Sequence, residues 1–482
     1  MSTSSVKDSK LELSEQSDIS SFDPDSFLQK ELDEDAQNNI NYRNCSWQKT
    51  AGLLFSEYIC LAIMSFPWSY SVLGLGLGLI VTVIVSLLCL YTGLIISDYC
   101  AAYPHLTNVC DIGQHLIFGS KWVWYATAAA FLLNNTLIQA LHVLVGAKYW
   151  NTISDNTTIC SIVFGVVTAI ICFLLSLPRT FSHMSGVGYF SAVTMFIAVL
   201  LAMIFAGIQS HPYKFDPATP VHWTAWPAPG AKYVDIMSAV LNIVYTFVGQ
   251  ITYPSFISQM KKPREFRKAL IVVTICELIT FALAGSIVYV YVGNAYITAP
   301  AFGSLTGNFK KIAFSFALPT ILFLGSLYSN VSSQFLFQEI FNKSSRHRNE
   351  HTALGWGVWI LLNFVLWCVA FVIAEVIPFF SDLLSLMSSL FDCFFGFIFW
   401  ALAYFKLRKL YYYKKEGVKI GYVELFKRSS LIQKGEFILN IIIFALGVYI
   451  LGPGLYATIQ SIIWSYQASL YGKPFSCVSN AI

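Results

Sequence analysis

The sequence has little charge for its length. Only 12% of its 482 residues are Asp, Glu, Lys or Arg, whereas about a quarter of the residues of an ordinary soluble domain are charged. Hydrophobic residues make up 56% of the chain. The composition therefore excludes a soluble enzyme, a disordered scaffold and a small disulfide-stabilised fold. It predicts an all-α membrane protein that crosses the bilayer many times.

Motifs of nucleotide, metal and nucleophilic chemistry are also missing. The sequence has no Walker-type phosphate loop, no His-Glu-x-x-His pair, no nucleophile elbow, and no two cysteines at the spacing of metal ligands. A membrane enzyme would need a second catalytic group beside His142, the one histidine well inside a predicted span. These absences exclude an ATP-driven pump. We expect no enzyme activity, no metal, no cofactor and no nucleic-acid partner.

The beginning of the chain is polar and acidic. Residues 1–40 hold ten acidic residues and three basic ones. Such a segment cannot bury enough apolar surface to fold, so we expect a disordered cytosolic tail over residues 1–44. The tail is either simply solvated or regulated by a modification such as phosphorylation.

Eleven apolar segments follow the tail, and each is long enough to span a bilayer, which takes about twenty residues. The predicted spans are 50–71, 74–100, 121–149, 159–177, 185–209, 233–259, 267–292, 310–341, 353–375, 378–405 and 436–467. They belong to a membrane domain over 45–470, which a short extracytosolic tail at 471–482 follows.

The basic residues predict the orientation of these spans. If the N-terminus is cytosolic, nineteen Lys and Arg residues fall in inner loops and six on the outer side, as the positive-inside rule requires. The outer side then holds Asn156, a glycosylation acceptor unless the match is due to chance. It also holds Cys160 and Cys477, which could form a disulfide in an oxidising compartment.

Two of the spans carry helix-breaking residues at matching positions. The first contains CLAIMSFPWSY, where Pro67 removes a backbone donor, and the sixth contains VLNIVYTFVGQITYPSF, where Gly249 and Pro254 interrupt an apolar helix. A simple kink would explain either proline alone. Breaks five spans apart favour an inverted-repeat transporter, with repeats at 50–209 and 233–405 and an extra helix at 436–467.

The sequence resembles the amino acid/auxin permease family, and within it the fungal neutral amino acid permeases, over about residues 45–465. The resemblance is carried by SEYICLAIMSFPWSYSVLG, QMKKPREFRKAL and LPTILFLGSLYSNVSSQFLFQEIF. It implies a LeuT-like fold with eleven spans, a cytosolic N-terminus, and movement of neutral amino acids driven by protons or, in some members, by sodium. The family usually has Gly at the position of Ala62 and often His at that of Gln250, so the substrate and any proton role of position 250 are open.

The two breaks predict the residues that line an amino acid site. Unwound carbonyls suit the ammonium group of the substrate, and half-helix N-termini suit its carboxylate. The expected lining is Ala62, Ile63, Met64 and Ser65 on the first helix, and Tyr245, Thr246, Phe247, Val248, Gly249 and Gln250 on the sixth. Ordinary helix packing is the alternative for each.

Polar residues in other spans add candidates. Asn135 and Gln139 share one face of the third span, where they either bind substrate or hydrogen-bond to other helices. The resemblance implies that Ser326 and Ser329 of the eighth span could supply hydroxyls to a sodium site, and a small-residue packing face is the alternative we favour.

Carboxylates within spans are costly and are therefore functional candidates. Glu277 lies near the middle of the seventh span and Asp392 near the middle of the tenth, while Glu57 lies nearer the inner start of the first. Asp392 is the first candidate for a proton-linked or ammonium-binding acid. The alternative is a neutral carboxyl that hydrogen-bonds to a neighbouring helix.

These observations predict a secondary active transporter of neutral amino acids that works by alternating access around two broken helices. We expect proton coupling in preference to sodium, and the plasma membrane in preference to the vacuolar membrane. The alternatives are a non-transporting amino acid sensor, which would bind substrate without uptake, and a transporter of another small solute on an internal membrane.

Overall fold

The computed structural model describes residues 45–117, 119–155, 159–179, 181–341, 345–468 and 474–478, together with 26, 28–30, 32–33 and 43. Most of the predicted tail and the acceptor Asn156 lie outside the described residues. Regular structure within the described part is helical, and its one β-bridge pairs Cys45 with Met260.

Eight helical segments among the described residues are long and apolar enough to cross a membrane. They are α5 (Leu75–Ala102), α7 (Lys121–Ser154), α9 (Phe181–Ile208), α12 (Phe266–Val292), α13 (Gly307–Ile340), α15 (Ala353–Val376), the segment Phe380–Glu416 and the segment Leu431–Gln467. A ninth is formed if the bent first segment counts as one span. Two shorter apolar helices, α8 (Ser161–Leu175) and α10 (Tyr233–Phe247), lie at the predicted fourth and sixth spans, so eleven crossings stay a prediction.

The outer surface of the helices is apolar, as lipid requires. On α12, Ile271, Ile275, Ile279 and Leu283 recur every fourth residue and are 42–55% exposed. A soluble helix buries such a stripe and exposes its polar face. Here the apolar stripe faces outward and polar groups such as Glu277 face inward, which identifies an integral membrane protein.

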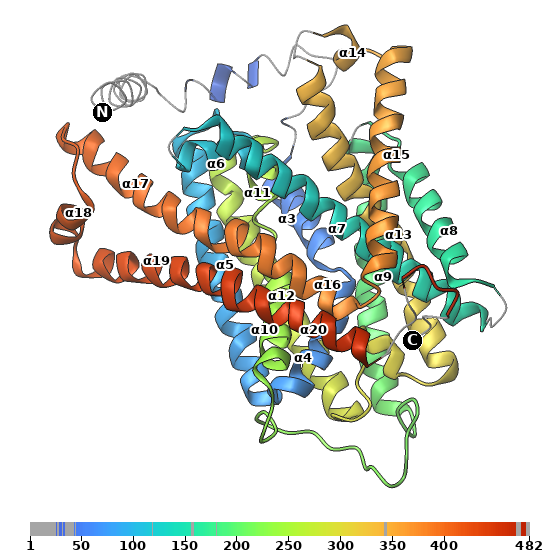
Figure 1. The fold of residues 1–482 in the computed structure, drawn as a ribbon. Coiled ribbons are helices and arrows are strands. Elements are labelled where there is room, and N and C mark those ends of the chain that lie inside the picture. Colours follow the sequence, from blue (N-terminus) through green and yellow to red (C-terminus); the bar gives the residue numbers. More distant parts are fainter. Residues whose placement is uncertain are drawn as a thin grey trace.

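The bundle is arranged around α12. It packs against the broken first segment, against α5 and against α9, while α13 packs on α7 and α9 at another side. In Figure 1, α6 (Val109–Leu116) and α14 (Arg346–Asn349) lie at one end of the bundle, and the connection from α9 to α10 lies at the opposite end.

The first segment is broken where the sequence predicts. Helix α3 (Trp47–Tyr58) is followed by the 3₁₀ turn η1 (Leu61–Ser65) and by α4 (Phe66–Leu73), and the two parts of the segment are bent by 42°. Pro67 stands in the first turn of α4, where its missing N–H costs nothing because that group has no helical partner. The proline thus starts the second half of the segment.

The sixth segment repeats this construction. Helix α10 ends at Phe247, residues 248–252 are not helical, and α11 (Tyr253–Ser258) begins with Pro254 in its first turn. The tenth segment, by contrast, is helical along its whole length. Between α16 (Phe380–Met387) and α17 (Phe399–Glu416), the wider π-helix η4 (Ser388–Ile398) carries Asp392, and π-helical turns occur frequently at functional sites.

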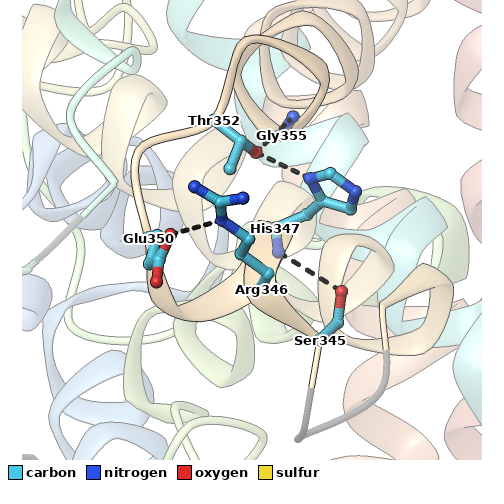
Figure 2. Close-up of polar contacts among 6 residues, drawn as sticks. All are labelled: Ser345, Arg346, His347, Glu350, Thr352 and Gly355. Atoms are coloured by element: carbon cyan, nitrogen blue, oxygen red, sulfur yellow. Dashed lines mark hydrogen bonds and ion pairs between the residues drawn. The ribbon is translucent and has the colours of Figure 1, made fainter.

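The short link between α13 and α15 is fixed by polar contacts (Figure 2). The His347 amide donates to Ser345 Oγ, and His347 Nδ1 lies 2.8 Å from Thr352 Oγ1, which accepts from the Gly355 amide at the start of α15. Arg346 donates to Glu350 over 2.6 Å at the surface, where such an ion pair adds little stability. The contacts cap α15 and set its position beside α13.

At the other end of the chain, Cys160 and Cys477 are joined in a disulfide. The bond links residues 317 positions apart and ties the C-terminal tail to the start of α8.

Candidate functional site

The two breaks open onto one cavity inside the bundle. The space outside protein atoms measures about 520 Å³, which includes open solvent. It is lined by Glu57, Tyr58, Cys60, Asn134, Ile138, Tyr245, Thr246, Val248, Gly249, Ile251, Tyr328, Asp392 and Phe395. These residues come from α3, α7, α10, α13, η4 and both breaks.

Five residues predicted from the sequence lie in this lining, namely Tyr245, Thr246, Val248, Gly249 and Asp392. The predicted neighbours on the sixth helix point elsewhere. The Phe247 ring packs against Phe66 and Phe281, and the Gln250 amide donates to Thr92 Oγ1 over 3.1 Å.

The predicted residues of the first helix form η1 and are buried beside the cavity rather than lining it. Ala62, Ile63, Met64 and Ser65 are at most 1% exposed. Ser65 Oγ donates to the Ala62 carbonyl over 2.7 Å, so its hydroxyl stabilises the turn itself. The cavity instead meets this helix at Cys60 and at the end of α3.

On the third segment, the cavity meets the face one residue earlier than predicted. Asn134 and Ile138 line it, whereas Asn135 donates to Ser332 Oγ of α13 over 3.1 Å. Gln139 is fully buried, and neither of its amide atoms has a hydrogen-bond partner among the described residues. Successive residues are rotated by about 100° around a helix. The pair Asn134 and Ile138 therefore faces the cavity, whereas Asn135 and Gln139 face away from it.

The two serines of the eighth segment make contacts between helices. Ser326 Oγ donates to the Cys172 carbonyl of α8, and Ser329 Oγ donates to Asn363 Oδ1 of α15, each over 2.9 Å. Neither serine lines the cavity. These contacts match the helix-packing alternative.

The most connected polar group in the lining is the carboxylate of Glu57. One of its oxygens accepts from the Tyr328 hydroxyl over 2.6 Å, and the other accepts from Thr252 Oγ1 over 3.2 Å. The carboxylate thereby connects α3 to α13 and to the break of the sixth segment.

Gly249 lets the two breaks approach each other. A Cβ atom at this position would lie 2.2 Å from the Tyr58 hydroxyl oxygen, far inside van der Waals contact. That hydroxyl is 2.5 Å from the Tyr253 hydroxyl at the start of α11. A larger residue here would force the Tyr58 ring to shift, because the backbone of the sixth segment lies against that ring.

The lining is acidic and otherwise uncharged. Its two carboxylates, Glu57 and Asp392, are both nine-tenths buried, and Asp392 Oδ2 has no hydrogen-bond partner among the described residues. No Lys, Arg or His is among the lining residues. The amides of Gly249, Gln250 and Ile251 donate to no backbone carbonyl in the described part of the chain. The site thus offers carboxyl oxygens and, at Gly249 and Ile251, N–H groups without a backbone partner in the described part of the chain.

The predicted lining lacked several of these residues, above all Tyr58 and Tyr328, and Glu57 was predicted near the inner start of its span rather than at the site. Glu57 carried a usable signal, since it is an acid beside an apolar helix break. The tyrosines carried none, because aromatic residues are frequent in this chain.

The chain matches the family model described as transmembrane amino acid transporter protein over residues 43–426. It is 34% identical over 443 residues to the N amino acid transport system protein of Neurospora crassa, covering 92% of this chain and 90% of that protein. A protein named transmembrane transporter from Gibberella moniliformis is 26% identical over 99% of this chain and 97% of its own length. A protein of the same name from Fusarium pseudograminearum is 25% identical over 96% of this chain and 93% of its own length. The chain therefore belongs to the transmembrane amino acid transporter family, which confirms the predicted family and agrees with a transporter rather than an enzyme.

Proposed function

We propose that this protein is a secondary active transporter that moves neutral amino acids across the plasma membrane together with protons. Substrate is held where the first and sixth segments are broken, in a LeuT-like arrangement of two inverted repeats plus an extra helix. Alternating access opens this site to either side in turn. The N-terminus is cytosolic, in keeping with the basic residues of the predicted inner loops.

The observation that carries the proposal is the cavity shared by both breaks. The free amides of Gly249, Gln250 and Ile251 suit a carboxylate, and the partnerless oxygen of Asp392 suits an ammonium group. A zwitterionic amino acid has both of these charged groups and needs a partner for each.

Neutral side chains are favoured by the rest of the lining. Ile138, Val248 and Phe395 provide apolar walls, and no basic residue is present to pair with an acidic side chain. The Neurospora relative named for amino acid transport supports an amino acid as the substrate.

Uptake of radiolabelled amino acids into transport-deficient cells, with pH and sodium varied separately, tests the proposal. We expect saturable uptake of neutral amino acids that rises at acid pH and does not depend on sodium. Uptake only of acidic or basic amino acids would contradict the substrate class. Dependence on sodium alone would contradict the coupling ion. Binding without uptake would indicate a sensor.

Asp392→Asn sharpens this test, because the variant keeps the side-chain volume and removes the charge. If Asp392 binds the substrate ammonium, KM rises by about tenfold or more, since a charged hydrogen bond contributes roughly 1.5–3 kcal/mol. An unchanged KM would exclude this role.

A further inference from the structure

Two buried carboxyl groups interact electrostatically within the bundle. Glu57 of α3 is 8% exposed and Glu277 of α12 is 3% exposed, and the two repel each other electrostatically. The hydrogen-bonded hydroxyls of Tyr58 and Tyr253 lie within electrostatic range of both acids. Glu277 Oε1 has no hydrogen-bond partner among the described residues. The sequence placed Glu277 alone near the middle of its span, and the fold makes it one member of a pair.

No cation in the described part of the chain interacts electrostatically with Glu57 or Glu277. The titratable groups that interact electrostatically with Glu57 are Tyr58, Cys60, Tyr245 of α10, Tyr253 of α11, Glu277 of α12 and Tyr328 of α13. Asp392 lies further along the same cavity wall. All of these groups are neutral or acidic.

Two uncompensated charges in a membrane interior cost several kcal/mol each, and their mutual repulsion adds to that cost. A state in which one of the two carboxyl groups is protonated avoids most of this cost. Of the two acids, only Glu57 lines the cavity, so Glu57 can exchange its proton with water there.

We propose that Glu57 is the binding site of the co-transported proton and that Glu277 is its buried partner. The inference rests on the proposed proton coupling and names the residues that perform it. On the outer side, a proton from water forms an O–H bond with a Glu57 oxygen. On the inner side that bond breaks, the proton returns to water, and the protein is left unchanged.

The hydrogen bonds of Glu57 connect this proton to the substrate. As a carboxylate, Glu57 accepts from Thr252 in the sixth-segment break and from Tyr328 in α13. A protonated oxygen becomes a donor and accepts poorly, so one of these two contacts must rearrange when the proton binds. Thr252 is two residues from the amide of Gln250 and three from that of Gly249, so the rearrangement reaches the proposed carboxylate site directly.

Asp382 provides a matched control. Its carboxylate is 5% exposed and also accepts two hydroxyl bonds, from Ser461 over 2.6 Å and from Ser465 over 2.9 Å. It does not line the cavity. If proton-coupled transport required a buried carboxylate at no particular position, Asp382→Asn would reduce it as much as Glu57→Gln.

The experiment uses the full-length protein in liposomes with a pH indicator inside, the membrane potential clamped to zero, and a neutral amino acid that the wild type transports. With an inward gradient of one pH unit, one proton per substrate accumulates the amino acid up to about tenfold. We expect accumulation and substrate-induced acidification in the wild type and in Asp382→Asn. Glu57→Gln should lose both and should still exchange labelled for unlabelled substrate at equal concentrations.

Each other outcome has a distinct meaning. Acidification by Glu57→Gln at the wild-type rate would overturn the inference. Loss of substrate exchange by a variant that still reaches the liposome would also overturn it and would make Glu57 a ligand of the substrate ammonium. A wild type that accumulates substrate with sodium and causes no acidification would contradict the proposed proton coupling itself.

Tyr328→Phe gives a second readout that does not remove the carboxyl group. The lost hydroxyl stabilised the charged form of Glu57, so proton binding becomes easier. The pH of half-maximal uptake should rise by about one unit. A variant with unchanged pH dependence would contradict the role of Glu57. Glu277→Gln should move this pH in the opposite direction, because it removes a neighbouring negative charge.

Discussion

The carboxylates of Glu57 and Asp382 have nearly the same immediate surroundings and very different positions. Each is buried and accepts two hydroxyl hydrogen bonds. The two donors to Asp382 are four residues apart on one helix, α20 (Leu455–Gln467), so this contact joins α16 to a single neighbour. The donors to Glu57 come from two elements, and one of them is a broken helix.

The difference teaches that hydrogen bonding alone does not identify a transport residue. A carboxylate held by one rigid helix stabilises a packing contact. A carboxylate shared between elements that move relative to each other transmits its protonation state to them. The predictions below test this distinction between the central region around the two breaks and the peripheral region around α16 and α20.

The largest effect is expected for Gly249→Ala in the central region. The added methyl group would lie 2.2 Å from the Tyr58 hydroxyl oxygen, so the contact between the two breaks must open. Transport should fall more than about tenfold, as expected when a site is displaced by about 1 Å, while the protein still reaches the membrane.

Gly357→Ala in α15 is the control, because a Cβ atom at Gly357 has no neighbouring atom within 4 Å. Its uptake should equal that of the wild type. Equal uptake by Gly249→Ala would show that the close approach of the breaks is dispensable.

Loss of the disulfide is expected to reduce stability without changing transport at the central site. Replacement of Cys160 or Cys477 by Ser should lower the free energy of unfolding by about 2–4 kcal/mol, and the double variant should be no worse than either single one. Thermal unfolding of the purified protein, with and without reductant, measures this. A large change in KM would mean that the tail acts on the cavity.

The double variant Ser461→Ala/Ser465→Ala tests the peripheral carboxylate directly. Asp382 loses both donors, and the free energy of unfolding should fall by roughly 2 kcal/mol. The pH dependence of uptake should stay that of the wild type. If the pH dependence of uptake shifted in this variant, Asp382 would affect transport as Glu57 does, and the two carboxylates would not differ in role.

The smallest effect concerns a buried titratable group outside the membrane-spanning segments, His115 on α6. Burial, with smaller contributions from Lys406 and His105, lowers the pKa of His115 to about 3. Because the unfolded chain binds a proton near pH 6.5, the neutral histidine stabilises the fold above that value, and this stability is lost as the pH falls toward 3.

At pH 5 the protein should therefore be about 1 kcal/mol less stable than at pH 7, an amount reduced by partial exposure. His115→Asn should remove this pH dependence of thermal unfolding and leave the pH dependence of uptake intact. If the pH dependence of thermal unfolding persisted in His115→Asn, a titratable group other than His115 would be its cause.

The sequence predicted the helical membrane class, the family and both helix breaks, because these depend on local properties. Apolar length follows from composition, and Pro67 and Pro254 each start a new helix wherever they stand in the fold. Two of the predicted residues, Val248 and Gly249, line the cavity, since they lie within a break and need no rotation to reach it.

Where prediction and structure differ, the cause is rotation about a helix axis or a contact distant in sequence. The lining face of α7 carries Asn134 instead of Asn135, a choice that only packing against α13 makes. The pairing of Glu57 with Glu277, 220 positions later in the chain, has no signature in either segment. Local chemistry thus determined which helices this protein forms and where they break, and only tertiary structure decided which polar side chains share the buried space, because that depends on how the helices pack against one another.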